Sequence, residues 1–353
     1  MSRILRLKFC VSGMFTALFL CGLCGPLNAQ VLITHNQSEQ KVDVVVNGAY
    51  FTSYVYDGTE LKKPVLFPVL SASGQTITRG FPIAPRAGER IDHTHHFGIW
   101  FNHGDVNGID FWNAGRTPPK PGVRYGQIKH KSVLESSSGA VGTLVVAKDW
   151  IDDNGQVLLE ETTHYEFSGD IHRRVLTHTT TVTASNQDIV FHDSKEGLFA
   201  IRVARELEIA SAKPAILLDL NLKETNEALL DNSQVSGRYL NSRGLEGYPE
   251  VWGKRASWMK LSGFVEREPI SILIFDSPEN INHPPHWMAR DYGLFAVNNL
   301  GSGVYTEGKE NLNFRLNKSE QRTFRNQLII TSGLTLDDAT INTWFEEFVG
   351  MPW

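Results

Sequence analysis

Residues 42 to 56 read Val42-Asp43-Val44-Val45-Val46-Asn47-Gly48-Ala49-Tyr50-Phe51-Thr52-Ser53-Tyr54-Val55-Tyr56. β-branched and aromatic residues fill both halves of this stretch, and these residue types favour extended strands. The Asn-Gly pair between the halves suits a two-residue primed turn, which needs a positive φ at both positions. The stretch therefore predicts a β-hairpin.

The same alternation of short apolar runs and turn residues continues along the chain. Asp152-Asp153-Asn154-Gly155, for example, separates two further runs that predict a second hairpin. Strands are predicted at residues 65–70, 141–149, 157–167, 174–183, 189–192, 198–203, 270–275, 294–298 and 327–331. Many short strands joined by Gly, Asn and Asp turns indicate an all-β fold, a large antiparallel sandwich.

One helix is predicted, near the C-terminus. Thr335 and Asp338 resemble a capping box at its start. Its apolar residues recur at helical spacing, which places them on one face. They are Ile341, Trp344, Phe345 and Phe348. We expect this helix to cover one face of a sheet.

The N-terminus has the pattern of a secretory signal peptide. Arg3, Arg6 and Lys8 precede an apolar run at residues 9–23, and Ala29 ends an acceptable cleavage site. A lipoprotein is less favoured, because leucine rather than a small residue stands immediately before both Cys21 and Cys24. The sequence therefore predicts a signal peptide at 1–29, a single β-sandwich domain at 30–353 and a secreted or periplasmic protein.

Composition narrows the function. All three cysteines, Cys10, Cys21 and Cys24, lie in the predicted leader, so a mature chain would have neither disulfides nor a catalytic thiol. The formal charge of the whole sequence is −5, and the leader carries three basic and no acidic residues. An acidic chain argues against nucleic acid as a partner. After the leader, no apolar run approaches the roughly 20 residues that a membrane helix needs.

Residues 92 to 112 combine residue types that few structural needs bring together. This segment holds four of the twelve histidines with three aspartates, two asparagines and two tryptophans. Imidazoles exchange protons near neutral pH or bind metals, and carboxylates act as bases or hold hydroxyls. Indoles offer flat apolar faces. The segment predicts a reactive or ligand-binding site.

Two later clusters are candidates for the walls of the same site. Residues 192–197 place Lys195 beside Glu196 between two apolar strands, where they are either solvated turn residues or a charge pair that enters a cleft. Residues 282–293 combine two adjacent prolines with His, Trp and Arg side chains. Upstream, residues 252–258 add two tryptophans beside a basic pair. Trp and Arg together suit sugar rings, although core packing is the more usual reason for any single Trp.

These clusters carry a family resemblance. Asp-His-x-His-His-x-Gly-x-Trp-Phe begins at Asp92 and is followed by Gly-Asp-Val-Asn-Gly-x-Asp-Phe-Trp, Lys-Glu-Gly-x-Phe-x-Ile-Arg, Gly-Lys-Arg-x-x-Trp and His-Pro-x-x-Trp-x-x-Arg-x-Tyr-Gly-Leu-Phe-x-x-Asn. The pattern resembles the bacterial PmoA-like (methane oxygenase PmoA) family over roughly residues 42 to 348. The methane oxidation that this family name implies does not fit, because such a membrane subunit needs several spanning helices.

A second resemblance concerns the fold. Residues 64–69, then Gly88-Glu89, then the histidine segment are similar to the early strands and first active-site loop of galactose-mutarotase-type supersandwich proteins. That fold is shared by sugar epimerases, many polysaccharide lyases and some glycoside hydrolases. The resemblance implies a carbohydrate ligand, but fold alone does not determine function.

The leading hypothesis is a carbohydrate-active enzyme, a glycoside hydrolase or lyase, that cleaves a glycosidic bond. The predicted catalytic acid and base are His95 or His96 together with Glu196. The predicted substrate contacts are polar or aromatic side chains of the same clusters. They are Asp92, Trp100, Asn107, Asp110, Trp112, Lys195, Arg202, Arg255, Trp258, His283, His286, Trp287 and Arg290.

Two other functions stay open. Ring opening or epimerisation of a free sugar needs only an acid and a base on opposite sides of the anomeric centre. A non-catalytic glycan-binding protein would use the aromatic residues and leave the histidines without a chemical role. The sequence leaves the oligomeric state undetermined.

A divalent metal is the last alternative. His93-Thr94-His95 on a strand would place two imidazoles on one face, because strand side chains alternate. His96, His103, His192, His283 or Asp92 would then complete the site. Since three or four converging ligands are needed, the pattern alone does not assign a metal, and no cofactor is predicted.

Overall fold

The computed structural model describes residues 30–56 and 61–351. The predicted leader at 1–29, with its cleavage site and all three cysteines, lies outside the described residues. Within the two described ranges, no helix is both long and apolar enough to cross a membrane.

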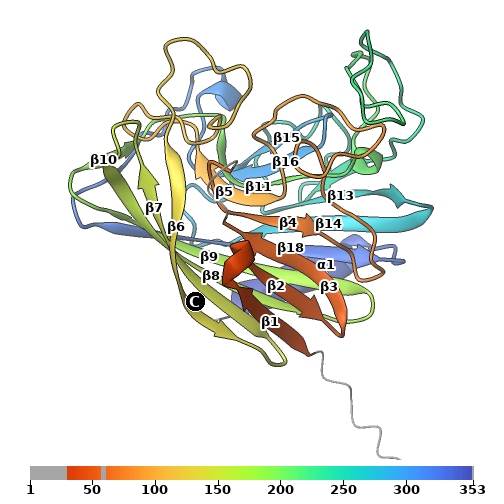
Figure 1. Cartoon of the computed structure of the whole chain (residues 1–353), viewed down its shortest axis with the longest axis horizontal. Coiled ribbons are helices and arrows are strands. Elements are labelled where there is room, and N and C mark those ends of the chain that lie inside the picture. The colour runs from red at the N-terminus through yellow and green to blue at the C-terminus, as the bar shows by residue number, and fades with distance from the viewer. Residues whose placement is uncertain (1–29, 57–60, 352–353) are drawn as a thin grey trace, which may run out of the picture.

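Two large antiparallel sheets form the body of the molecule (Figure 1). The first has the order β1 (Val31–Asn36), β2 (Lys41–Val46), β3 (Ala49–Val55), β4 (Val65–Val69), β5 (Ile99–His103), β11 (Gly197–Arg202), β16 (Leu294–Asn298), β15 (His286–Ala289). The second has the order β12 (Arg238–Asn241), β13 (Trp258–Val265), β14 (Glu268–Asp276), β18 (Gln321–Ser332), β9 (Arg173–Ala184), β8 (Val157–Gly169), β7 (Gly142–Ile151), β6 (Gln127–Ser137). The predicted all-β sandwich is confirmed.

Short elements complete the fold. β10 (Ile189–Phe191) pairs with β17 (Phe314–Leu316), outside the two large sheets. Three 3-10 turns lie at η1 (Gln37–Glu39), η2 (Arg205–Leu207) and η3 (Val304–Thr306). The described part of the chain contains one α-helix, α1 (Asp338–Gly350).

The N-terminal hairpin forms as its sequence predicts. β2 pairs with β3, and both turn residues have positive φ, 53° for Asn47 and 74° for Gly48. This is the backbone that a type I′ turn requires. In β2 every second side chain is buried, so one face of the hairpin joins the core between the sheets.

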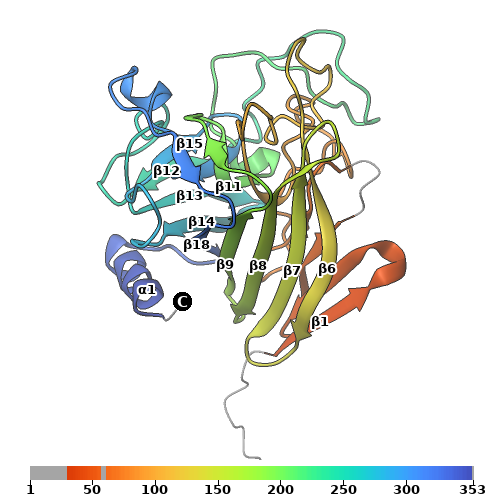
Figure 2. The same ribbon diagram turned by 90° about the vertical axis from the view of Figure 1, so that its left-hand side faces the viewer.

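The C-terminal helix covers the outer face of the second sheet, as predicted. Figure 2 shows α1 beside β14 and β18, on the side of these strands away from β1. Ile341 and Phe348 are buried in a cluster with Phe275 and Ile329 of the sheet. The predicted capping box is wrong: the N-cap is Asp337, whose side chain accepts a hydrogen bond from the amide of Thr340 at 2.8 Å.

The half of the first sheet that runs from β5 to the edge strand β15 is buried on both faces. All side chains of β5, β11, β15 and β16 are buried, although antiparallel sheets commonly leave one face in water. One face packs in the main core against the second sheet. Loops cover the other face, above these strands in Figure 1. A cavity lies among these loops.

Candidate functional site

A cavity of about 210 Å³ lies between the loops and the first sheet. Twelve side chains from four distant segments of the chain line it. They are His93, His95, His96, Trp112, Asn113, Arg116, Lys120, Lys195, Glu196, Met288, Arg290 and Tyr292. The three clusters that the sequence singled out therefore meet in one place.

The floor beneath these side chains is a row across four strands. Trp100 pairs with Ala200, Ala200 with Ala296, and Ala296 with Met288. The four side chains belong to one apolar cluster on the outer face of the sheet. Because the two central residues are alanines, the row is lower between Trp100 and Met288, which leaves room for loop side chains above it.

A buried arginine holds the histidine loop. Arg79 donates to the carbonyl oxygens of Arg90 (3.2 Å), Asp92 (2.7 Å), His93 (2.8 Å) and His96 (2.7 Å), and to Oδ1 of Asp92 (2.9 Å). Its side chain is 1% exposed. Burial, together with the neighbouring Arg202, lowers the pKa of Arg79 to about 9. One side chain thus fixes the path of the whole loop.

Asp92 is the charge partner of this arginine pair. Nη2 of Arg202 donates to its Oδ1 at 2.7 Å, and Nδ1 of His93 lies 3.2 Å from its Oδ2. Burial raises the pKa of Asp92, but the charges of Arg202 and Arg79 and the contact with His93 outweigh this, so the pKa lies well below its usual range. Asp92 is therefore an anion that orients His93.

Aromatic rings fix the imidazoles in a stack. His93 lies between Tyr292, with centroids 4.7 Å apart, and His96, with centroids 4.9 Å apart. His96 in turn stacks on Trp100 at 5.4 Å. The metal alternative supposed that His93-Thr94-His95 lies on a strand, but β5 begins only at Ile99 and His93 has a φ of 45°. His93 and His96 are the parallel pair, with planes 3° apart.

Two of these imidazoles are buried without hydrogen bonds. His95 and His96 are each 1% exposed, and none of their ring nitrogens has a partner. Burial lowers the pKa of His95 to about 2 and that of His96 well below its ordinary value. Both rings are thus neutral at pH 7. Unpartnered polar atoms in a buried site are costly, and a ligand with hydroxyl groups would satisfy them.

A buried lysine supports the loop from behind. Nζ of Lys63 donates to the carbonyl oxygen of His95 at 2.7 Å and lies 5.0 Å from the ring centre of Trp100. Burial lowers the pKa of Lys63 to about 7, although the charge of Asp110 opposes this shift. Lys63 therefore positions His95 through the backbone.

An asparagine links two carboxylates. Nδ2 of Asn113 donates to Oδ2 of Asp110 at 2.8 Å and to Oε2 of Glu196 at 2.6 Å. Nζ of Lys195 donates to the other oxygen of Glu196 at 3.3 Å. Burial raises the pKa of Asp110. Glu196 lines the cavity, whereas Asp110 stands behind Asn113.

Ten of the thirteen predicted substrate contacts do not line the cavity, whereas Trp112, Lys195 and Arg290 do. Four of the ten contact a lining residue from behind: Asp92, Trp100, Asp110 and Arg202. The other six lie elsewhere. Nδ2 of Asn107 donates to the carbonyl of Asp188, and Arg255 donates to the carbonyls of Asn282 and Pro284, so both hold loops together. The other four have polar atoms bonded elsewhere in the protein. Their partners are Asn342 for Trp258, Asp276 for His283, the Gly253 carbonyl for His286 and the Ala256 carbonyl for Trp287.

The candidate metal ligands divide into two places. His93, His95 and His96 line the cavity, but Nε2 of His103 is bonded to the carbonyl oxygen of His192 at 2.8 Å. Burial lowers the pKa of His103 to about 4. Among the residues that the structure describes, no three or more His, Cys, Asp or Glu side chains are arranged to hold a metal ion.

Several residues of the site were not predicted from the sequence. Tyr292 and Asn113 stand next to or inside the clusters, so their positions carried a signal. Arg79, Lys63, Arg116 and Lys120 lie in ordinary polar stretches, and nothing in their local sequence marks them.

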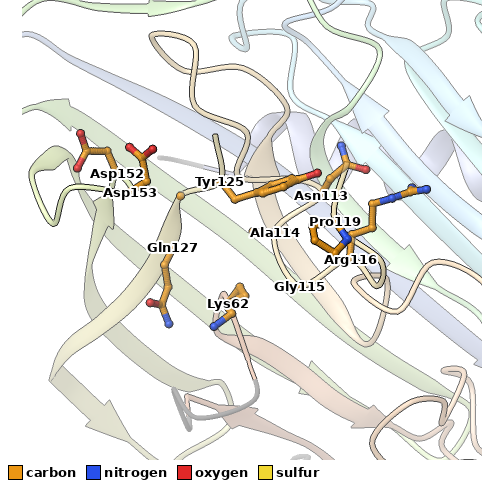
Figure 3. A pocket seen from close by; sticks show the side chains of 11 residues that line it. Lys62, Asn113, Ala114, Gly115, Arg116, Pro119, Tyr125, Gln127, Asp152 and Asp153 are labelled. Carbon is orange, nitrogen blue, oxygen red and sulfur yellow. The ribbon is translucent and has the colours of Figure 1, made fainter. Parts of the chain in front are cut away.

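A larger hollow adjoins the cavity. Its volume is about 430 Å³, and it shares Asn113 and Arg116 with the cavity. Figure 3 shows Tyr125 between these two residues and the acidic pair Asp152 and Asp153. The two spaces are therefore neighbours that share part of their lining.

Fold and site together define an all-β sandwich with a polar, histidine-rich cavity on its first sheet. The chain belongs to the family of unknown function DUF6807, whose model matches residues 41–346. The resemblance to PmoA-like proteins has no counterpart in that description and stays a prediction. No curated protein matches the chain in sequence.

Solved structures show distant likenesses. The galactosidase domain of the α-galactosidase–sucrose kinase AgaSK is 10% identical with a TM-score of 0.37, and the match covers 85% of this chain and 41% of that one. A β-arabinopyranosidase is 9% identical with a TM-score of 0.31, over 87% and 38% of the two chains. A protein from Escherichia coli K12 assigned as an aldose 1-epimerase is 11% identical with a TM-score of 0.30, over 86% and 98%.

This chain thus spans about two fifths of the length of the first two structures and nearly all of the third. At TM-scores below 0.5, these likenesses carry nothing over to the cavity.

Proposed function

We propose that the protein is a carbohydrate-active enzyme that cleaves a glycosidic bond by proton transfer in the histidine cavity. The observation that supports this most is the meeting of the His93 imidazole, which lies beside Asp92, with the side chain of Glu196 in one cavity. Acid and base groups on facing walls are what such a reaction needs. We also propose that it acts in the periplasm or outside the cell, which rests on the leader pattern alone.

In this proposal His93 and Glu196 exchange the protons. Asp92 orients His93 from one side, as a carboxylate does for a catalytic imidazole, and the ring stack fixes the plane of His93. Glu196 is held by Asn113 and Lys195. A pKa of about 2 makes His95 a weak base, so we assign His95 and His96 to hydrogen bonds with ring hydroxyls rather than to the acid–base pair expected from the sequence.

The neighbouring hollow favours cleavage over epimerisation. A space of about 210 Å³ is smaller than the roughly 300–1,000 Å³ of most ligand sites, and suits a single ring. The hollow in Figure 3 supplies room for the next ring of a chain. Epimerisation of a free sugar is the second candidate, and the small volume of the cavity is what favours it.

Two carboxylates facing each other across the substrate are the usual arrangement for glycoside hydrolysis. Here Asp110 and Glu196 bind the same Asn113 amide, and only Glu196 lines the cavity. This arrangement favours a reaction in which an imidazole or phenol shares the proton transfer with one carboxylate. Elimination needs only such a pair when the sugar has an acidic C–H beside a carboxylate.

The test is mass spectrometry of products after the purified protein is incubated with a panel of plant, algal and host glycans. New fragments would support cleavage: a fragment that has gained water indicates hydrolysis, and an unsaturated fragment indicates elimination. A parallel incubation with EDTA tests the metal alternative. If no glycan is cut and free sugars change their anomeric or epimeric ratio, the second candidate replaces the first.

A further inference from the structure

The lining of the cavity is strongly cationic. Four of its side chains carry a positive charge, Arg116, Lys120, Lys195 and Arg290, and one acidic side chain, Glu196, faces them among the described lining residues. The full sequence has a formal charge of −5, so this charge is concentrated at the site and opposite in sign to the chain as a whole.

Three of the four cations have no acidic partner. Nζ of Lys195 is 3.3 Å from Oε1 of Glu196. Within residues 30–56 and 61–351, Arg116, Lys120 and Arg290 form no ion pair. Nε of Arg116 and Nε of Arg290 are buried without any hydrogen-bond partner. Deeper arginines of the molecule behave differently: Arg79 and Arg202 are both paired with Asp92.

Arg290 is also held in a fixed direction. Its guanidinium lies 5.4 Å from the ring centre of Tyr292 and 5.8 Å from that of Trp252. Stacking of this kind leaves the N–H edge of a guanidinium free to bind a planar anion in a bidentate manner. A guanidinium that aromatic rings orient, and that has no carboxylate partner in the described protein, is suited to bind an anionic group of a ligand.

We propose that the sugar ring that enters the cavity carries an anionic substituent, a carboxylate or a sulfate, which Arg290 and the other cations of the lining, Arg116, Lys120 and Lys195, bind. This inference rests on the proposed carbohydrate function and names the class of its substrate. The unbonded imidazoles of His95 and His96 then serve the hydroxyls of the same ring. One ligand would satisfy both the orphaned nitrogens and the unpaired charges.

The test measures binding of small sugars to the purified protein by isothermal titration calorimetry. Galacturonic acid and galactose 6-sulfate are each compared with galactose, at low and at high salt. We expect at least one of the two acidic sugars to have a dissociation constant at least about tenfold lower than that of galactose at low salt. This difference in dissociation constant should become smaller at high salt, because salt screens charges. The acidic sugar that binds more tightly shows whether the cavity prefers a carboxylate or a sulfate.

Substitutions in the lining test whether the cations of the cavity cause the preference for acidic sugars. Lys120→Gln and Arg116→Gln should each weaken binding of the preferred acidic sugar by about fivefold at low salt. Lys309→Gln is the matched control, because Lys309 is an exposed lysine of a surface loop. Glu196→Gln should instead tighten acidic-sugar binding, because it removes the acidic side chain of the lining.

Each other outcome overturns the inference. If galactose binds as tightly as the acidic sugars, or if Lys120→Gln and Arg116→Gln behave like Lys309→Gln, the cations do not select the substrate. Cleavage of a neutral glycan in the product assay would support the proposed enzyme activity. It would contradict only the inference that the substrate carries an acidic group. Absence of binding by all three sugars also contradicts the inference.

Discussion

Arg79 determines the shape of the site although it does not line the cavity. Its guanidinium bonds four carbonyl oxygens and one carboxylate of residues 90–96. Backbone carbonyls in a loop have no sheet partners, so a buried side chain must satisfy them. The planar fork of arginine reaches several acceptors at once, whereas a lysine ammonium has a single charged centre.

We therefore predict that Arg79→Gln lowers the free energy of unfolding by about 3–5 kcal/mol, the usual cost of leaving a partner group uncompensated in the interior. Arg79→Lys should restore only part of this loss. Denaturant unfolding measures both, with Arg243→Gln as control, because Arg243 lies exposed in a turn. Equal stability of Arg79→Gln and Arg243→Gln would show that the hydrogen-bond network does not support the loop.

Glu196→Gln tests the proposed chemistry at the level of one atom. The amide keeps the shape of the side chain but no longer exchanges a proton, so glycan cleavage should fall by about 10²- to 10⁴-fold. The unfolding free energy should change by less than about 1 kcal/mol, because Glu196 is only partly buried. Glu135→Gln, on an exposed part of β6, is the matched control. Full activity in Glu196→Gln would remove Glu196 from the mechanism.

The candidate site could be predicted in part from residue types. The clusters around His95, Glu196 and Arg290 were visible because unusual residues stood close together in the sequence, and the structure brings them to one cavity. The sequence predicts Trp258 and Trp287 as sugar contacts, but the Trp258 indole bonds to Asn342 of α1 and the Trp287 indole to the carbonyl of Ala256. Sequence cannot distinguish the two cases, because a Trp that packs and a Trp that binds a sugar look alike without their surroundings.

At the scale of elements, sequence patterns predicted a turn or helix correctly where its conformation depends on its own residues. The turn at Asn47-Gly48 and the apolar face of α1 need no distant partner, and both formed as predicted. The histidine segment did not, because its conformation depends on Arg79, Lys63 and Arg202 from other parts of the chain. A loop whose backbone bonds distant side chains leaves no periodic pattern in its own sequence.

The contact between α1 and the second sheet gives a prediction with a matched control. Phe348 is fully buried against Phe275, whereas Phe264 on β13 is 56% exposed. Phe348→Ala should lower the unfolding free energy by about 3–5 kcal/mol, since it leaves a cavity. Phe264→Ala should change it by no more than about 0.5 kcal/mol. Equal effects in thermal and denaturant unfolding would mean that α1 does not contribute to the cooperative core.

The whole molecule buries several neutral histidines. His95, His96, His103 and His178 are each 0 to 1% exposed, and burial lowers the pKa of all four from the ordinary 6.5. Below pH 6.5 the unfolded chain therefore binds protons at these positions that the folded chain does not bind. The folded state loses stability as the pH falls through this range, and the effect is absent well above it.

We predict that the free energy of unfolding decreases from pH 7.5 towards pH 5.5, with each buried histidine approaching a slope of about 1.4 kcal/mol per pH unit. Denaturant unfolding at several pH values measures this slope. His178→Gln removes one titrating group far from the cavity, in contact with Phe199 of the core. Its slope should be shallower than that of the natural protein, and identical slopes would contradict the neutral state of His178.

The fold class could be predicted from the sequence, but the pairing of distant strands could not. Short alternating runs indicate a sandwich, and the structure confirms it with two eight-stranded sheets. The pairing of β5 with β11 and of β14 with β18 joins segments far apart in sequence. Such pairings depend on which faces become buried together, and a single sequence holds no record of that. The cavity depends on these pairings, so its full lining required the structure.

Two kinds of structure form the cavity and its surroundings, a sheet and a connecting loop. Beneath the cavity lies a row of residues on four adjacent hydrogen-bonded strands of the first sheet, Trp100, Ala200, Ala296 and Met288, of which Met288 lines the cavity. Arg116 and Lys120, by contrast, stand on the connection between β5 and β6. Connections of this kind tolerate replacement, and sheet centres do not. In the proposed enzyme, exchanging residues 114–126 would therefore change which molecules the cavity admits, while Asn113 still bonds to Glu196 and the sheet beneath the cavity stays the same.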